Sequence, residues 1–281
     1  MVGEHDVRKH RARALSQALY ALSKRWWWTS IACKLGVFVV GASIVLWFPG
    51  LKYSAVLIFL IYLASELSLL RSDWFKGRAE TILRKLDFEE SFDWKVSGAE
   101  MVDYELRSPA RVRKMLPSTP SEKKYFASSE PFGPRRAAEN VLESSFWSKH
   151  QAERMGNWCL VITCILIVGS VVILVVSIDT VKNINSLSNI GRVVTSVLML
   201  VFSLGLLKLM LGYYAFSKKA ERTEQVAEHL LKTDCEERDA IKVLHDYQVA
   251  RATAPLIPTT LWKWMGKDLN EQWERRQSPT G

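Results

Sequence analysis

Four long apolar stretches constrain this chain more than any other feature of its sequence. They cover residues 26–48, 53–70, 158–178 and 193–216, and the third contains no charged residue. A helix needs roughly 20 apolar residues to cross a hydrocarbon core about 30 Å thick. Transmembrane strands would show alternating polarity, which is absent here, and lipid does not tolerate unpaired backbone groups. The sequence therefore predicts an all-α membrane protein whose four transmembrane helices form two hairpins.

The polar residues around these stretches predict helical cytoplasmic extensions and a loop-rich cytoplasmic insert. Apolar residues recur at helical spacing beyond the spans, and such stripes must be buried against something. One stripe follows the second span and consists of Phe75, Ala79, Ile82, Leu83 and Leu86. We therefore expect a cytoplasmic helical bundle. The predicted organisation is a basic amphipathic helix (1–25), a transmembrane hairpin (26–70), an insert of helices and loops (71–157), a second hairpin (158–216) and a C-terminal helical region (217–281).

Three of these polar segments leave structural alternatives open. The helix over residues 1–25 either lies on the membrane or packs against another helix. Residues 87–136 hold five of the nine prolines, so we predict loops there with short strands or helices. After the fourth span the apolar stripe predicts one long helix that ends before Pro255. Trp262, Trp264 and Trp273 then favour a further helix at the membrane interface.

The distribution of Lys and Arg predicts the orientation of the spans. The short links between the paired spans hold few cations: Lys52 in the first link, and Lys182 and Arg192 in the second. The N-terminal flank, the insert and the C-terminal region hold many more. Because cytoplasmic loops carry the excess of Lys and Arg, we expect a multi-pass inner-membrane protein with both termini in the cytoplasm.

Charge and motif content limit the classes of function. The clearest surplus behind the net charge of +9 lies just before the first span, where residues 1–29 hold six Lys and Arg against two acidic residues, so the lipid bilayer explains it more simply than a nucleic acid polymer. The cysteines have no metal-ligand spacing, and we expect neither a metal nor a cofactor. No H-E-x-x-H, G-x-S-x-G, Walker A or G-x-G-x-x-G sequence occurs, so we expect no enzyme.

Charged residues inside the spans are the sharpest functional candidates, because burying a charge in lipid is costly. They are Lys34, Glu66 and Lys208. Glu66 and Lys208 lie near the same membrane face and either pair with each other or reach the headgroups separately. Alternatively, Glu66 belongs to a ring of carboxylates around a cation pathway. Small residues in the spans follow no strict GxxxG pattern and predict only general close packing.

A second candidate site is a group of basic residues in the insert. Arginine binds phosphate through paired hydrogen bonds, so the group is suited to a phosphate-bearing ligand. Contact with solvent or with anionic lipid is the alternative. The candidates are Arg107, Arg111, Arg113, Lys114, Arg135 and Arg136.

Several sequence phrases, together with the order of spans and insert, resemble a known family. The phrases are LRSDWFKGRAE (70–80), RKLD (84–87), YFASS (125–129), and ESSFWSK (143–149). The chain resembles the SMODS-associated four-transmembrane family of pore-forming effectors in bacterial conflict systems. The resemblance implies an antiphage effector that disrupts the inner membrane when a nucleotide second messenger, such as a cyclic nucleotide, triggers it.

Two functional hypotheses follow from these observations. The first is a ligand-gated pore built by a homo-oligomer, because four short spans in one subunit can hardly enclose a conducting pathway. The second is a non-conducting membrane anchor whose cytoplasmic bundle binds a protein partner. A small transporter ranks below both, because the sequence shows no paired broken helices or inverted repeat.

Overall fold

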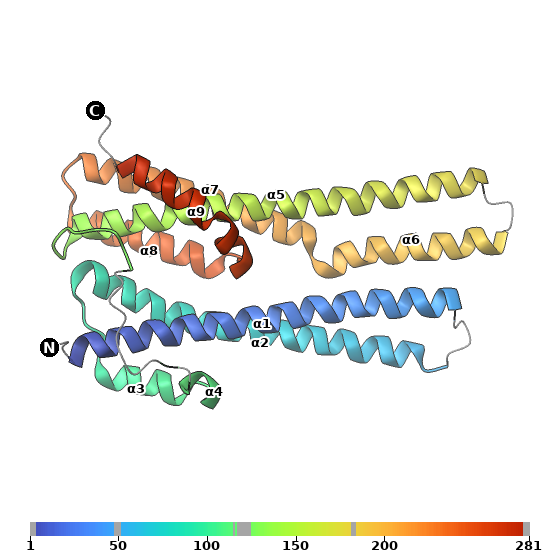
Figure 1. The fold of residues 1–281 in the computed structure, drawn as a ribbon, viewed down its shortest axis with the longest axis horizontal. Coiled ribbons are helices and arrows are strands. Elements are labelled where there is room, and N and C mark those ends of the chain that lie inside the picture. The colour runs from blue at the N-terminus through green and yellow to red at the C-terminus, as the bar shows by residue number, and fades with distance from the viewer. Residues whose placement is uncertain (1–3, 48–51, 115, 117–124, 181–183, 278–281) are drawn as a thin grey trace. The chain divides into compact units, whose positions relative to one another are not determined.

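The computed structural model describes residues 4–47, 52–114, 116, 125–180 and 184–277. Over these residues the regular structure is helical without strands, and four helical segments are long and apolar enough to cross a membrane. The chain is therefore an all-α membrane protein, as the sequence predicts (Figure 1). Its described helices are α1 (Glu4–Trp47), α2 (Ser54–Phe92), α3 (Gly98–Leu106), α4 (Ala110–Arg113), α5 (Pro134–Thr180), α6 (Ile184–Leu204), α7 (Leu206–Lys232), α8 (Glu237–Thr253) and α9 (Thr259–Gln277).

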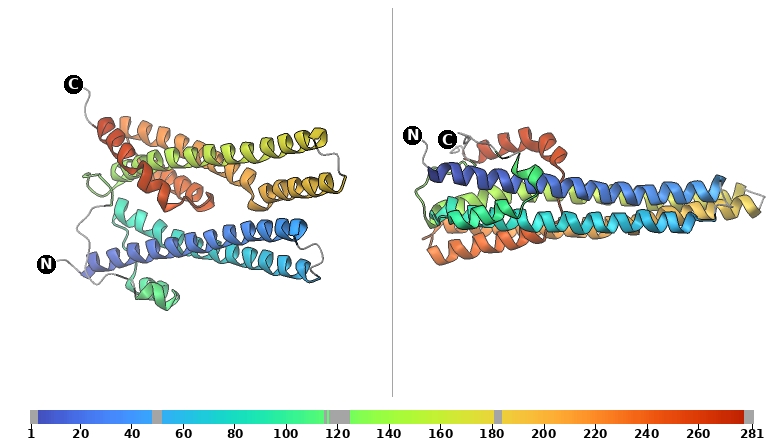
Figure 2. Two further views of the ribbon diagram at one scale, coloured as in Figure 1. Left: turned by 45° about the vertical axis from the view of Figure 1, so that its right-hand side comes forward. Right: turned by 90° about the horizontal axis from the view of Figure 1, so that it is seen from below.

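The chain divides into two compact units. We call Lys24–Asp73 with Arg154–Tyr213 the membrane unit. We call Met1–Ser23, Trp74–Glu153 and Tyr214–Gly281 the polar bundle. Helices α1, α2, α5 and α7 contribute to both units, because none of them ends where one unit gives way to the other. The course of each helix can be followed in Figure 2 from two further directions.

The membrane unit exposes apolar side chains and buries small polar ones. Val, Ile, Leu and Phe side chains, such as Phe59 and Val172, are exposed on α2 and α5. Between α1 and α2 the hydroxyl oxygens of Ser30 and Ser65 lie 3.0 Å apart, and the Ser65 hydroxyl donates to the Ser30 carbonyl at 3.1 Å. Small side chains let membrane helices approach closely, and their hydroxyls bond across the contact.

The buried residues of these helices repeat every seven positions. Along α2, buried residues alternate three and four positions apart: Ser65, Ser68, Ser72, Phe75, Ala79, Ile82, Leu86 and Glu89. On α5 a small residue is buried at each of Gly156, Thr163, Ser170 and Ser177. A seven-residue repeat keeps one face of a helix toward its partner in left-handed packing. The close packing expected from the sequence therefore follows a period that a search for GxxxG does not detect.

The fourth span differs from its prediction as one helix over residues 193–216. Helix α6 begins at Ile184, inside the expected polar link, and ends at Leu204, and α7 begins at Leu206. Gly205 has φ +65°, and its N–H donates to the Phe202 carbonyl at 3.0 Å. A left-handed residue interrupts the regular hydrogen bonding of a helix, and glycine adopts this conformation without a Cβ clash.

In the polar bundle, the N-terminal part of α1 packs against α2, which decides between the two alternatives for this segment. The side chains of Leu15 and Leu19 are buried, and the Ser16 hydroxyl donates to the Ala79 carbonyl at 3.0 Å.

The described part of the insert contains the end of α2, helices α3 and α4, and the start of α5, and within that part no strand occurs.

The C-terminal region forms α7, α8 and α9, so the prediction of one helix from the fourth span to Pro255 is wrong. Helix α7 ends at Lys232, and α8 begins after Glu236, whose backbone is extended. Glu237 and Asp239 occupy the first turn of α8, where carboxylates interact favourably with the helix dipole. The core that α5, α7 and α8 share consists of Val141, Ala227, Leu230, Val243, Leu244 and Tyr247.

We predict that Gly205→Ala destabilises the membrane unit by about 1–2 kcal/mol, because an L-residue is strained in the left-handed conformation. Gly169→Ala is the matched control. Gly169 lies in helix α5, and an added Cβ there meets no other group within 4 Å. Thermal unfolding in detergent micelles should show a lower midpoint for the Gly205 variant alone. Equal midpoints for the two variants would contradict the role given to Gly205.

Candidate functional site

The charged residues of the spans are arranged differently from the predicted Glu66–Lys208 pair. Glu66 of α2 pairs with Lys34 of α1, with 3.2 Å between Oε1 and Nζ. Lys208 is the third residue of α7, just after the break at Gly205, and its side chain is exposed. Consecutive antiparallel spans face each other, so the pair with Lys34 joins the two helices of the first hairpin.

The predicted basic group of the insert does not converge on one site. Arg107 pairs with Asp103 on its own helix at 2.8 Å, and Arg135 lies 3.8 Å from Glu130. Arg111, Arg113 and Lys114 are exposed on and just after α4. Only Arg136 enters a buried cluster, where it meets cations that were not among the candidates.

This cluster, the Glu90 cluster, consists of Lys9, Arg13, Glu90 and Arg136. Glu90 Oε1 lies 3.0 Å from Lys9 Nζ and 2.9 Å from Arg13 Nη2. Its other oxygen, Oε2, lies 3.8 Å from Arg136 Nη2. The Glu90 side chain is only 9% exposed. Three cations therefore surround one largely buried carboxylate.

Local helix geometry brings these residues together. Lys9 and Arg13 are four residues apart on α1, so both side chains lie on one helix face. Glu90 adjoins Glu89, the last of the buried residues that alternate three and four apart along α2. Arg136 lies in the first turn of α5 and also donates to the Glu130 carbonyl at 3.0 Å. The cluster thus joins three of the four helices that contribute to both units.

The electrostatics of the Glu90 cluster favour an anion. Burial by itself would raise the pKa of Glu90, but the Arg13 guanidinium and the Lys9 ammonium outweigh burial and hold this pKa below its ordinary value. Among these four side chains, three positive charges face one negative charge. The buried Nε atoms of Arg13 and Arg136 also lack a hydrogen-bond acceptor among the described residues. Unused guanidinium donors are suited to carboxylate or phosphate oxygens.

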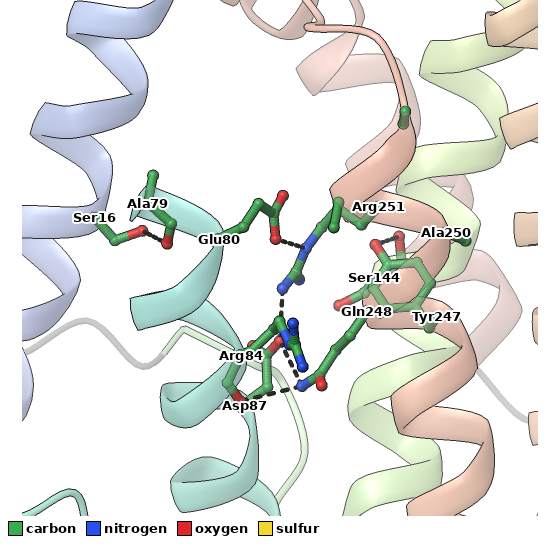
Figure 3. A network of polar contacts seen from close by, with 12 residues as sticks. Ser16, Ala79, Glu80, Arg84, Asp87, Ser144, Tyr247, Gln248, Ala250 and Arg251 are labelled. Carbon is green, nitrogen blue, oxygen red and sulfur yellow. Dashed lines mark hydrogen bonds and ion pairs between the residues drawn. The ribbon is translucent and has the colours of Figure 1, made fainter. Parts of the chain in front are cut away.

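A second buried network ties α8 to α2 (Figure 3). Arg251 of α8 lies between two carboxylates, with Nε 3.1 Å from Glu80 Oε2 and Nη2 2.8 Å from Asp87 Oδ2. Gln248 donates to Asp87 Oδ2 at 3.3 Å and to the Arg84 carbonyl at 3.1 Å. Glu80 and Asp87 are seven residues apart, so both lie on the side of α2 that Arg251 can bridge.

Burial has the largest effect on the pKa of Asp87 in this network. Desolvation raises the pKa of Asp87 above its ordinary value, although Arg251 and Gln248 favour its charged form. Asp87 Oδ1 and Gln248 Oε1 are buried without a hydrogen-bond partner among the described residues. Removing one partner from a buried ion pair leaves an uncompensated charge, so each member of the network depends on the others.

Comparison with known proteins gives no relative for this chain: no family model, curated protein or solved structure matches it. Within the described residues, no group of three or more His, Cys, Asp or Glu side chains is arranged to hold a metal ion. The two clusters can therefore be interpreted only from their own geometry, which allows binding of an anion and coupling between helices.

Sequence reasoning missed Lys9, Arg13 and Glu90 because their contacts join distant parts of the chain. Lys9 and Arg13 were interpreted as the polar face of an amphipathic helix. One available signal was their spacing of four, which sets two cations on one face of α1. The other signal was the interruption of the apolar stripe on α2 by consecutive carboxylates at Glu89 and Glu90. Neither signal reveals that Arg136 completes the cluster.

We predict that Arg251→Ala destabilises the polar bundle by about 3–5 kcal/mol, because it leaves the Glu80 and Asp87 carboxylates buried without their shared cation. Arg238→Ala, at an exposed position of the same helix, should change stability by no more than about 0.5 kcal/mol. Hydrogen exchange followed by mass spectrometry should show faster exchange of α8 amides in the Arg251 variant only. Unchanged exchange of α8 in that variant would contradict a stabilising role for the network.

Proposed function

We propose that this chain is a subunit of an oligomeric, ligand-gated pore in a bacterial inner membrane. In this proposal the termini and the polar bundle lie in the cytoplasm, a nucleotide second messenger opens the pore, and loss of the membrane barrier protects the bacterial population from phage. The excess of Lys and Arg outside the two short links supports this orientation. The resemblance to the SMODS-associated four-transmembrane family supports the trigger and the biological role.

The observation that carries the proposal is the position of the Glu90 cluster. Its residues belong to α1, α2 and α5, and each of these helices also contributes a span to the membrane unit. An anion that competes with Glu90 for the surrounding cations would change how these three helices are held together. A ligand in the polar bundle would then act on the spans through continuous helices.

A nucleotide suits this cluster because its phosphates are anionic and carry several acceptor oxygens. Arg13 and Arg136 each have a buried Nε without an acceptor among the described residues, which a phosphate oxygen would supply. A ligand gates a protein only when it binds one of two states more tightly. In this proposal Glu90 pairs with the three cations in the resting state, and the phosphate of the nucleotide pairs with them in the open state.

The packing of the membrane unit supports a pathway between subunits. Buried serines fill the contact between α1 and α2, and a series of small residues is buried along α5. Such contacts bring helices close together and leave little room between paired spans. The proposal therefore places the conducting pathway at an interface between copies of the chain.

We predict that purified protein in dye-loaded vesicles releases dye only when one member of a panel of cyclic oligonucleotides is added. Arg13→Gln should require at least about tenfold more nucleotide, because a hydrogen bond to a charged group contributes about 1.5–3 kcal/mol. Arg11→Gln is the matched control on the same helix, since Arg11 pairs with Glu105 at 2.8 Å and not with Glu90. Arg13→Lys retains the charge and serves as a second variant if the glutamine variant misfolds.

Two outcomes would overturn different parts of the proposal. Folded protein that releases no dye with any nucleotide would contradict the pore and favour the non-conducting anchor, which should instead co-purify with a soluble partner. Nucleotide-dependent release that is the same in the Arg13 and Arg11 variants would leave the pore standing and remove the Glu90 cluster as its gate.

A further inference from the structure

Helix α9 begins at the end of the polar bundle where the helices leave the membrane unit. The bundle resumes at Trp74 in α2 and at Tyr214 in α7. Two residues beyond Trp74, Lys76 Nζ donates to the Ala252 carbonyl at 2.7 Å and also to the Ala254 carbonyl. These bonds hold the chain that leads into α9 beside the first turn of α2 outside the membrane unit.

A small apolar cluster fixes the same segment from the other side. Ala254 packs with Phe216 of α7 and Ala152 of α5, and Ile257 lies against them. Phe216 lies three residues after the end of the membrane unit at Tyr213, and Ala152 lies two residues before Arg154, where the unit resumes. Helix α9 starts at Thr259, so its first turn belongs to this membrane-proximal end.

The other end of α9 packs on α5 and α7 at positions further along these helices from the membrane unit. Trp273 is buried against Phe146, with 5.2 Å between ring centroids. Arg276 binds Glu224 and Glu228, which lie further along α7 from the membrane unit. Helix α9 therefore runs from the end of the polar bundle where α5 and α7 continue into the spans toward the part of the bundle further along these helices.

The first two turns of α9 expose an amphipathic surface. Trp262 and Trp264 are 53% and 58% exposed, and Lys263 between them is exposed as well. Trp74, at the same end of the bundle, is 49% exposed, with the Arg78 guanidinium 3.8 Å from its ring centroid. Tryptophan is enriched at membrane–water interfaces, where its ring meets the acyl boundary and its N–H meets polar groups.

We propose that the first two turns of α9, through Trp262 and Trp264, insert into the headgroup region of the lipid bilayer and anchor the C-terminal region to the membrane surface. The occupant is lipid because the tryptophans lie at the level where α2, α5 and α7 leave the membrane unit. The exposed Lys263 ammonium is suited to anionic headgroups. Trp273, by contrast, has a packing role and does not belong to this surface.

The test uses the full chain with its four cysteines replaced by serine and a single new cysteine labelled with an environment-sensitive fluorophore. Trp264→Cys reports on the proposed surface, Lys263→Cys is a second reporter in the same turn, and Gln272→Cys is the matched control near the other end of α9. In vesicles that contain lipid with a headgroup spin label, quenching should be several-fold stronger at positions 263 and 264 than at position 272. Aqueous iodide should quench in the opposite order.

Strong iodide quenching at positions 263 and 264 without lipid quenching would overturn the proposal. So would protection from iodide that disappears when the protein is diluted among more vesicles, because that result identifies a second copy of the chain as the occupant. Protection that is independent of protein density, together with quenching by the labelled headgroups, supports lipid insertion. Neither result depends on whether the protein forms a pore.

Discussion

Close packing along a seven-residue repeat is the constraint on which the rest of this structure depends. Lipid tails are as apolar as leucine side chains, so moving an apolar side chain from lipid into a helix contact brings no hydrophobic stabilisation. Spans therefore associate through close packing of small residues and through hydrogen bonds between helices. Ser30 and Ser65 provide such a contact in the membrane unit, and Ser16 bonds to the Ala79 carbonyl in the polar bundle. On α2 the repeat changes from serines to Phe75, Ile82 and Leu86 as the solvent changes from lipid to water.

Buried ion pairs then give the polar bundle its specific arrangement. Arg251 joins α8 to two carboxylates of α2, and the Glu90 cluster joins α1, α2 and α5. Each pair is costly to desolvate, so its partners must stay in place together. The same dependence makes the Glu90 cluster suited to a trigger, because replacing one anion by another alters contacts on three helices at once. A purely apolar core would contain no charged group for which an anionic ligand could compete.

The sequence predicts the features that depend on composition and period, and misses those that depend on pairing. The all-α fold and the buried stripe of Phe75, Ala79 and Ile82 follow from apolar spacing and are confirmed. The break at Gly205 was missed because a glycine in an apolar run resembles any other small residue, and its left-handed backbone has no signature there. The predicted pairing of Glu66 with Lys208 is wrong, because Glu66 pairs with Lys34 of the adjacent antiparallel span. The Glu90 cluster depends on tertiary contacts that no local pattern contains.

Ionic current across a planar bilayer tests the central claim, that a ligand bound in the polar bundle opens the membrane. The protein is inserted in one orientation, and the nucleotide that releases dye from vesicles is added to each side in turn at fixed voltage. If the nucleotide acts through the polar bundle, discrete conductance steps appear when it is on the side of that bundle, and none appear when it is on the opposite side. Current that is equal from both sides, or equal without nucleotide, would contradict gating through the polar bundle.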